Sequence, residues 1–218
     1  MVLIQSGNDQ YGSWQDVSIN GVVQRFRWIP AGDFLMDAPV DDSPRRVVIE
    51  DGFWLGDTPV TQDLWSAVMG DNPSYYRGRW RPVERVSWND CQRFLASLPE
   101  PDAGWRLPSE AEWEHACRAG PAHVPDQSLD QVAWYEQSTG TRPVATKAPS
   151  PLGLYDMLGN VWEWCSTTTP DSLGMGPARV VRGGSWRSYA RYVRAAYRGA
   201  RRPAARYVSL GFRLARSA

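Results

Sequence analysis

Cysteine, histidine and lysine are scarce in this sequence, which limits the metal and redox sites that it can form. Its three cysteines, Cys91, Cys117 and Cys165, show no CxxC spacing. We therefore expect buried free thiols, with one disulfide and a spare thiol as the alternative. The two histidines, His115 and His123, lack ligand spacing, so a zinc site built on the three cysteines is not expected.

Long apolar runs are absent as well. No stretch approaches the roughly 20 residues that a membrane-spanning helix needs, and the first residues lack a basic region followed by an apolar core. We therefore expect a cytoplasmic protein, while surface display stays open. The 218 residues show no internal repeat and no break in composition, which predicts one domain over residues 1–218. We also expect a monomer.

Acidic residues are missing from the last part of the chain. From Ser172 to Ala218 there are eleven arginines and no Asp or Glu, whereas the preceding residues carry thirteen basic and twenty-four acidic side chains. The basic tail could pair with the acidic part or attract an anionic partner. Because the two totals cancel, we favour internal pairing and expect Arg191, Arg194 and Arg198 to contact the acidic half.

Tryptophan and proline, by contrast, are abundant. Twelve Trp and seventeen Pro indicate a loop-rich fold braced by large aromatic side chains. Three short helices are predicted, with N-caps at Thr61, at Ser87 or Asn89, and at Ser109, where Glu112 completes a capping box. Short strands after helices favour an α+β fold over alternating βαβ units.

Six motifs occur in a fixed order and together resemble one family. They are "FWLGDTPVT", "VSWNDC", "RLPSEAEWEHACRAG", "GLYDMLGNVWEW", "VVRGGSW" and "LGFRLAR". This set is similar to formylglycine-generating enzymes, also called sulfatase-modifying factors. The resemblance implies an α+β, C-type lectin-like fold with two main helices, short antiparallel sheets and much irregular loop.

The resemblance does not extend to the residues that the family's chemistry needs. Formylglycine-generating enzymes oxidise a substrate cysteine with copper and oxygen, and the resemblance places their paired cysteines just after "RGGS". Low-valent copper prefers thiolates, but this chain reads "WRSYARYVRAAYR" there, without cysteine. We therefore expect no enzyme, and a formylglycine-generating-enzyme-like oxidoreductase or an enzyme of unknown reaction is the alternative.

The closing stretch, residues 182–216, resembles the variable segment of diversity-generating retroelement proteins, which carry a hypervariable binding surface on a fixed scaffold. Its Tyr, Arg, Ser and Gly residues follow no hydrophobic period, and such residues are typical of adaptable binding surfaces. We expect this surface to bind a protein or another macromolecule. The predicted ligand-binding residues are Arg187, Ser188, Tyr189, Tyr192, Tyr197, Gly199, Arg202, Ala205, Tyr207, Val208 and Ser209.

Two alternatives to this interpretation remain open. The tyrosines could pack inside the domain, or they could stack nucleic-acid bases between the arginines. The residues expected to serve as scaffold within the segment are Trp186, Val193, Ala195, Ala196, Leu210 and Phe212.

The resemblance also implies a structural calcium ion at "YDMLGNVWEW". The matching ligands are the carboxylates of Asp156 and Glu163 and the backbone carbonyls of Gly159 and Val161. Such hard oxygen ligands suit calcium. Alternatively, Asp156 caps the turn and Glu163 pairs with an arginine.

Overall fold

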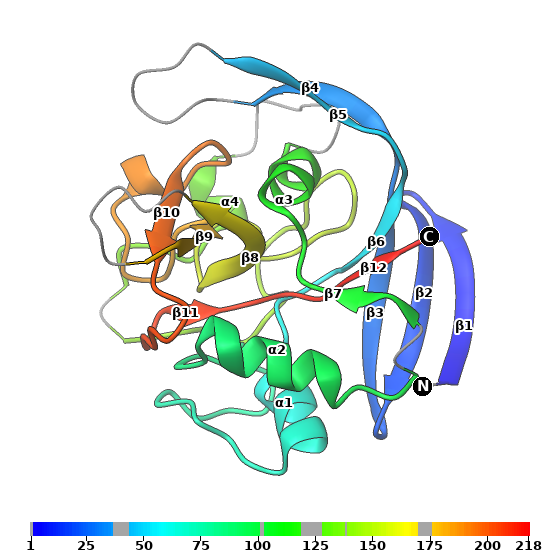
Figure 1. The fold of residues 1–218 in the computed structure, drawn as a ribbon, viewed down its shortest axis with the longest axis vertical. Helices are drawn as coiled ribbons and strands as arrows, with labels where there is room; N and C mark the ends of the chain where they lie inside the picture. Colours follow the sequence, from blue (N-terminus) through cyan, green and yellow to red (C-terminus); the bar gives the residue numbers. More distant parts are fainter. Residues whose placement is uncertain (1, 37–43, 101–102, 119–127, 138, 170–175) are drawn as a thin grey trace.

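A computed structural model of the chain describes residues 2–36, 44–100, 103–118, 128–137, 139–169 and 176–218. His123 lies outside these residues. The largest sheet is antiparallel throughout and joins distant parts of the chain (Figure 1). Its strands run in the order β1 (Val2–Asp9), β2 (Gly12–Ile19), β3 (Val22–Ile29), β6 (Phe53–Gly56), β12 (Ala215–Ser217) and β7 (Trp105–Arg106).

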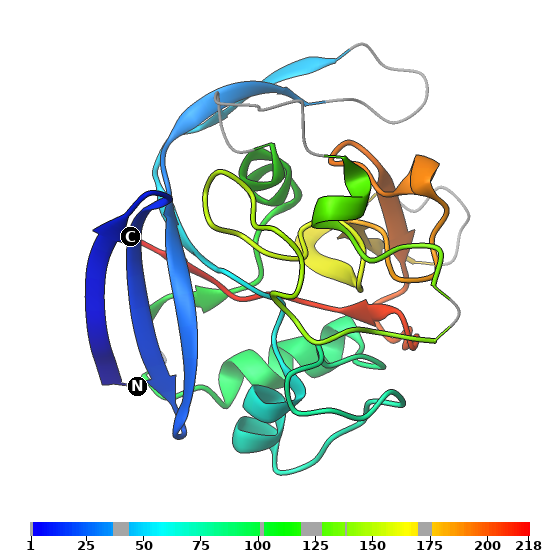
Figure 2. The same cartoon turned by 180° about the vertical axis from the view of Figure 1, so that it is seen from behind.

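A smaller sheet carries the C-terminal segment. Its four strands run in the order β10 (Arg198–Arg201), β9 (Ala178–Arg182), β8 (Trp162–Thr169) and β11 (Leu210–Gly211). Strand β11 is parallel to β8, and the other two pairs are antiparallel. A separate hairpin, β4 (Gly32–Met36) and β5 (Arg45–Ile49), arches over one side of the molecule (Figure 2).

The helices begin where the capping residues predict. Thr61 accepts from the amide of Leu64 and begins α1 (Gln62–Met69). Ser87 begins α2 (Trp88–Ala96), and Ser109 and Glu112 form the expected capping box of α3 (Glu110–Cys117). The resemblance implied two main helices, whereas the described residues form these three α-helices and a four-residue helix, α4 (Leu129–Val132). The α+β class is confirmed.

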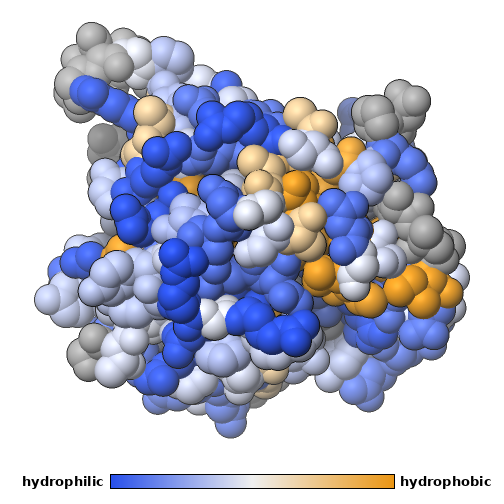
Figure 3. All heavy atoms as spheres, turned by 90° about the horizontal axis from the view of Figure 1, so that it is seen from below, coloured by the Kyte–Doolittle hydropathy of each residue, from blue (hydrophilic) through white to orange (hydrophobic). Residues whose placement is uncertain are grey.

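The core consists of two apolar clusters in which large aromatic rings pack. Trp164 and Phe212 are fully buried in the cluster between the sheets and α1 and α2, and Trp113 is fully buried in the cluster beside α3. The three cysteines are free, as expected. Within the described ranges, no helix has the length and apolar content to span a bilayer. The surface on the side of α1 and α2 is mostly hydrophilic, with apolar spheres gathered toward one side (Figure 3).

Candidate functional site

The C-terminal segment, residues 182–216, is attached to the rest of the molecule through main-chain atoms. The carbonyls of Trp186 and Ser188 accept from the amides of Gln137 (2.6 Å) and Glu136 (3.1 Å). Further along, carbonyls of the segment accept from framework amides in three more places: Tyr207 from Arg85 (3.0 Å), Ser209 from Trp162 (2.8 Å) and Pro203 from Asn89 (3.3 Å). These bonds do not depend on which side chains the segment carries.

Buried ion pairs hold the two ends of the segment. At its start, the fully buried Arg182 bonds to the carboxylate of Glu114 in α3. Near its end, the guanidinium of Arg213 makes two contacts of 2.7 Å to the fully buried carboxylate of Glu163. Since each charge is matched by a close opposite charge, burial of the pair is tolerated, whereas loss of one partner would leave an uncompensated charge.

The expected pairing of the basic tail with the acidic half is confirmed for part of the tail. Arg198 pairs with Glu110 at 2.7 Å, and Arg206 pairs with Asp90 at 2.6 Å. The prediction was wrong for Arg191 and Arg194, which form no ion pair among the described residues. Their guanidinium groups lie over tyrosine rings of the same segment instead, Arg191 over Tyr192 and Arg194 over Tyr197.

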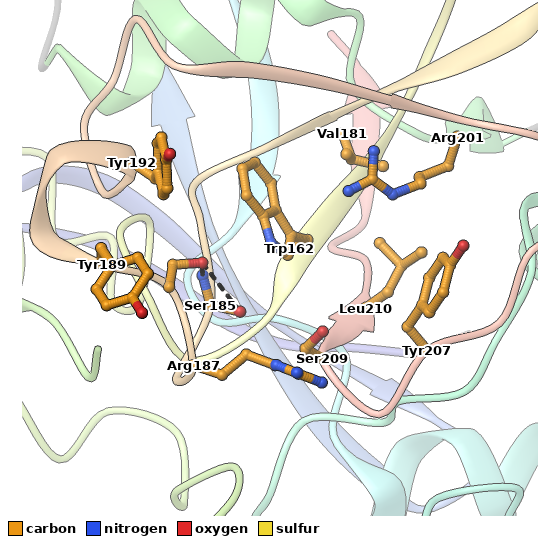
Figure 4. Close-up of a pocket in the computed structure, with 11 residues that line it drawn as sticks. Trp162, Val181, Ser185, Arg187, Tyr189, Tyr192, Arg201, Tyr207, Ser209 and Leu210 are labelled. Carbon is orange, nitrogen blue, oxygen red and sulfur yellow. Dashed lines mark hydrogen bonds between the residues drawn. The ribbon is translucent and has the colours of Figure 1, made fainter. Parts of the chain in front are cut away.

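A pocket of about 430 Å³ lies between the segment and strands β8 and β9. Its lining is Trp162, Val181, Ser185, Arg187, Ser188, Tyr189, Tyr192, Arg201, Tyr207, Ser209 and Leu210. Figure 4 shows the indole of Trp162 between the Tyr189 and Tyr192 rings on one side and Arg201 and Tyr207 on the other. This size and this mixture of aromatic, apolar and polar groups are typical of ligand sites.

The four tyrosines of the segment are not sealed in the core. Tyr189 and Tyr207 are 62% and 49% exposed, and Tyr192 and Tyr197 are half-buried. Tyr192 and Tyr197 have ring centroids 4.8 Å apart, and Tyr197 lies 5.8 Å from Trp162. The four rings therefore do not pack inside the domain, and that alternative is wrong.

Six of the eleven residues expected to bind ligand line the pocket: Arg187, Ser188, Tyr189, Tyr192, Tyr207 and Ser209. The other five, which lie outside the lining, are Tyr197, Gly199, Arg202, Ala205 and Val208. Ala205 packs against the core cluster, and the carbonyl of Val208 accepts from the Trp186 indole. Ligand contact by any of the eleven stays a prediction.

Five lining residues were not expected from the sequence: Trp162, Val181, Ser185, Arg201 and Leu210. Arg201 had a usable signal in the alternation of β10, where Arg198 faces Glu110 and Arg201 lies on the opposite side of the strand. Leu210, expected to be scaffold, is both buried and part of the lining.

The two carboxylates expected to bind calcium, Asp156 and Glu163, differ in their hydrogen-bond partners. Glu163 does not fit a calcium ligand, because both of its oxygens accept from Arg213 and one also accepts from the Trp113 indole at 2.7 Å. Asp156 fits better: it is buried, and burial raises its pKa to about 6. Within the described residues its carboxylate accepts from the Ala145 amide and from the side chain of Asn160. In the described part of the chain, no three His, Cys, Asp or Glu side chains gather as a metal cluster.

The residues after "RGGS" contain hydroxyl, guanidinium and aromatic groups but no thiol. The cysteines of the chain lie elsewhere, and burial raises the pKa of Cys117 to about 12 and those of Cys91 and Cys165 well above their usual range. Because the thiolate is the form that binds copper and attacks substrates, these cysteines are poorly suited to either task.

A half-buried carboxylate beside Arg213 makes stability depend on pH. The carbonyl of Asp57 accepts from Arg213, and burial raises the pKa of its carboxyl group from 3.8 to about 7. The folded state therefore holds the proton of Asp57 more tightly than the unfolded state does. The stability that this proton contributes is present at low pH and is lost as the pH rises toward 7. We expect Asp57→Asn to flatten the fall in unfolding free energy between pH 5 and pH 8, as measured by urea denaturation. Asp51→Asn, at an exposed position, serves as control; parallel curves for wild type and Asp57→Asn would contradict the expectation.

Comparisons with known proteins agree with this geometry. The family model described as "Sulfatase-modifying factor enzyme 1-like domain" matches residues 20–218. The chaperone protein LppX of Paenibacillus barcinonensis is 30% identical over 72% of this chain and 77% of its own length. The formylglycine-generating enzyme of Thermomonospora curvata is 30% identical, over 88% of this chain and 73% of its own length.

A solved structure shows the same fold. Treponema denticola variable protein 1 superimposes with a TM-score of 0.82 at 28% identity, covering 94% of this chain and 99% of that chain. The predicted fold of the formylglycine-generating-enzyme type is thus confirmed. Since the family model covers all but the first strands, this chain belongs to the sulfatase-modifying factor enzyme 1-like family.

Proposed function

We propose that this chain is a non-catalytic, ligand-binding variable protein of a diversity-generating retroelement. Its binding surface is residues 182–216, and its ligand is a protein. The observation that carries the proposal is that the framework bonds the main chain of this segment while side chains of the same segment stay exposed. Framework amides hold the carbonyls of Ser188, Tyr207 and Ser209, while the exposed rings of Tyr189 and Tyr207 border the pocket.

This contrast suits a surface that must accept many sequences. A side-chain substitution at Ser188 or Tyr207 leaves the main-chain bond of that residue in place. Tyrosine offers a large contact area at a small cost in side-chain entropy, and serine adapts its hydrogen bonding to the ligand. The likeness to Treponema denticola variable protein 1 supports the proposal.

Kinship with formylglycine-generating enzymes makes catalysis the alternative. The chemistry inferred for those enzymes needs thiolates after "RGGS", where this chain has Trp186, Arg187 and Ser188. We therefore favour binding over oxidation of a cysteine substrate.

The DNA that encodes the chain tests the proposal. We expect a second, near-identical copy of the coding segment for residues 182–216, differing mainly at adenines, beside a gene for a reverse transcriptase. A locus with neither the copy nor the reverse transcriptase would contradict the retroelement part of the proposal.

Calcium binding remains a prediction, in a narrower form than the sequence suggested. Asp156 would supply the carboxylate, Gly159 and Val161 the backbone carbonyls, and Glu163 would stay paired with Arg213. We expect calcium at about 100 times its Kd to raise the Tm by roughly 5 °C, because a ligand of the folded state stabilises it. Differential scanning calorimetry with calcium or magnesium measures the shift.

The matched control for this measurement is Asp57→Asn, which also removes a carboxylate with a raised pKa. This variant should keep the calcium response, whereas Asp156→Asn should lose it. A Tm that is independent of calcium in the wild-type chain would exclude the site.

A further inference from the structure

The lining of the pocket carries charge of one sign. It includes two arginines, Arg187 and Arg201, and no Asp or Glu. In Figure 4, Arg187 extends beside Ser209 at one edge, and the guanidinium of Arg201 lies near Val181 at another. A group bound over the indole of Trp162 would therefore have a positive charge on two sides.

This positive charge is not neutralised within the described part of the chain. The two arginines of the lining, Arg187 and Arg201, form no ion pair there, and neither do Arg191 and Arg194 of the same segment. Each of the four lies over an aromatic ring. Among the described residues, Glu136 contacts this part of the segment, and its carboxylate accepts from the amide of Ala190 at 3.0 Å. Stacking orients a guanidinium while leaving its N–H groups available to a carboxylate.

The floor of the pocket is apolar. Trp162, Val181 and Leu210 form it, and Ser185 and Ser188 bond to each other at 3.2 Å beside it. A ligand that fills the pocket therefore needs an apolar or aromatic group for the floor and negative charge for the edges.

We propose that the pocket takes an acidic protein segment, in which an apolar or aromatic side chain sits on Trp162 and neighbouring Asp or Glu carboxylates pair with Arg187 and Arg201. This rests on the proposed function and names the class of ligand. A protein segment is favoured over nucleic acid because the two unpaired arginines of the lining, Arg187 and Arg201, both face one pocket of about 430 Å³. Single-stranded nucleic acid needs a charged groove that follows its backbone.

Selection from a random library of phage-displayed 12-residue peptides tests this inference. With the wild-type chain as bait, we expect the recovered peptides to be enriched in Asp and Glu around an apolar or aromatic residue. One recovered peptide, labelled with fluorescein, then gives the Kd by anisotropy at low and high salt. The double variant Arg187→Gln/Arg201→Gln should weaken binding about tenfold or more, since each charge-assisted hydrogen bond contributes strongly.

The matched control is Arg46→Gln, because Arg46 is 71% exposed, lies on β5 and is paired with Asp33. It should leave the Kd within about twofold, as expected for a surface ion pair. Enrichment of neutral or basic peptides, or no enrichment at all, would overturn the inference. So would tighter binding of a 20-nucleotide oligothymidylate than of the selected peptide, which would assign the face to nucleic acid.

Failure of the inference is distinguishable from failure of the proposed function. If the selected peptides are neutral but lose binding in Tyr189→Ser and Tyr207→Ser, the proposed binding surface stands. In that case only its preference for acidic ligands is wrong. Peptides whose binding is unaffected by those two substitutions would argue against both.

Discussion

Replacing Arg213 by leucine is expected to destabilise the protein by about 3–5 kcal/mol, the cost of leaving one member of a buried ion pair without its partner. Arg213 is fully buried and donates to the carboxylate of Glu163 and to the carbonyls of Gly56 and Tyr155. For a chain of this length, the change corresponds to a fall in Tm of roughly 10 °C. Thermal unfolding followed by circular dichroism measures it.

The control for this prediction makes the same substitution in a more exposed pair. Arg106 also contacts a carboxylate twice at 2.7 Å, that of Glu112, but its side chain is 32% exposed. Arg106→Leu should cost about 1 kcal/mol, as partly solvated pairs do. If Arg213→Leu does not fold, Arg213→Lys keeps the charge and loses the paired geometry, and it should fall between the two. Equal losses for Arg213→Leu and Arg106→Leu would show that burial of the pair is not what holds this end of the segment.

The sequence predicted the features that depend on interactions between residues close together in the chain. The N-caps at Thr61 and Ser109 depend on hydrogen bonds to residues three positions away, and both helices begin there. Ser87, not Asn89, begins α2, because the carboxylate of Asp90 completes a capping box with it. The lack of a hydrophobic period around Tyr189 likewise predicted an exposed ring, because a buried element needs one apolar face.

The floor of the pocket could not be predicted from the sequence, because it forms through contacts between residues far apart in the chain. Trp162, Val181 and Leu210 are apolar strand residues, and nothing local separates a pocket floor from a core. They meet only because β8 pairs with both β9 and β11. Distant contacts also decide which arginine meets an acid: Arg198 reaches Glu110 across 88 positions. Arg191 and Arg194 have no such acid within the described residues and lie over the neighbouring rings of Tyr192 and Tyr197.

The second prediction concerns the side chains that border the pocket. We expect the double variant Tyr189→Ser/Tyr207→Ser to lose about 100-fold or more in affinity for a peptide selected by the wild-type chain, because exposed aromatic anchors dominate such interfaces. Its free energy of unfolding should change by no more than about 1 kcal/mol, since both rings lie at the surface. Urea denaturation and fluorescence anisotropy measure the two quantities on the same preparations.

Comparing the loss of affinity with the change in the free energy of unfolding shows whether the two rings belong to a replaceable surface or to the framework. Tyr11→Ser is the control, because Tyr11 lies at the turn between β1 and β2, outside the pocket lining, with Arg27 over its ring. It should leave peptide affinity unchanged. If the double variant instead unfolds as readily as Arg213→Leu, the two rings are part of the framework. The segment could not then vary as the proposed function requires, however many main-chain bonds hold it.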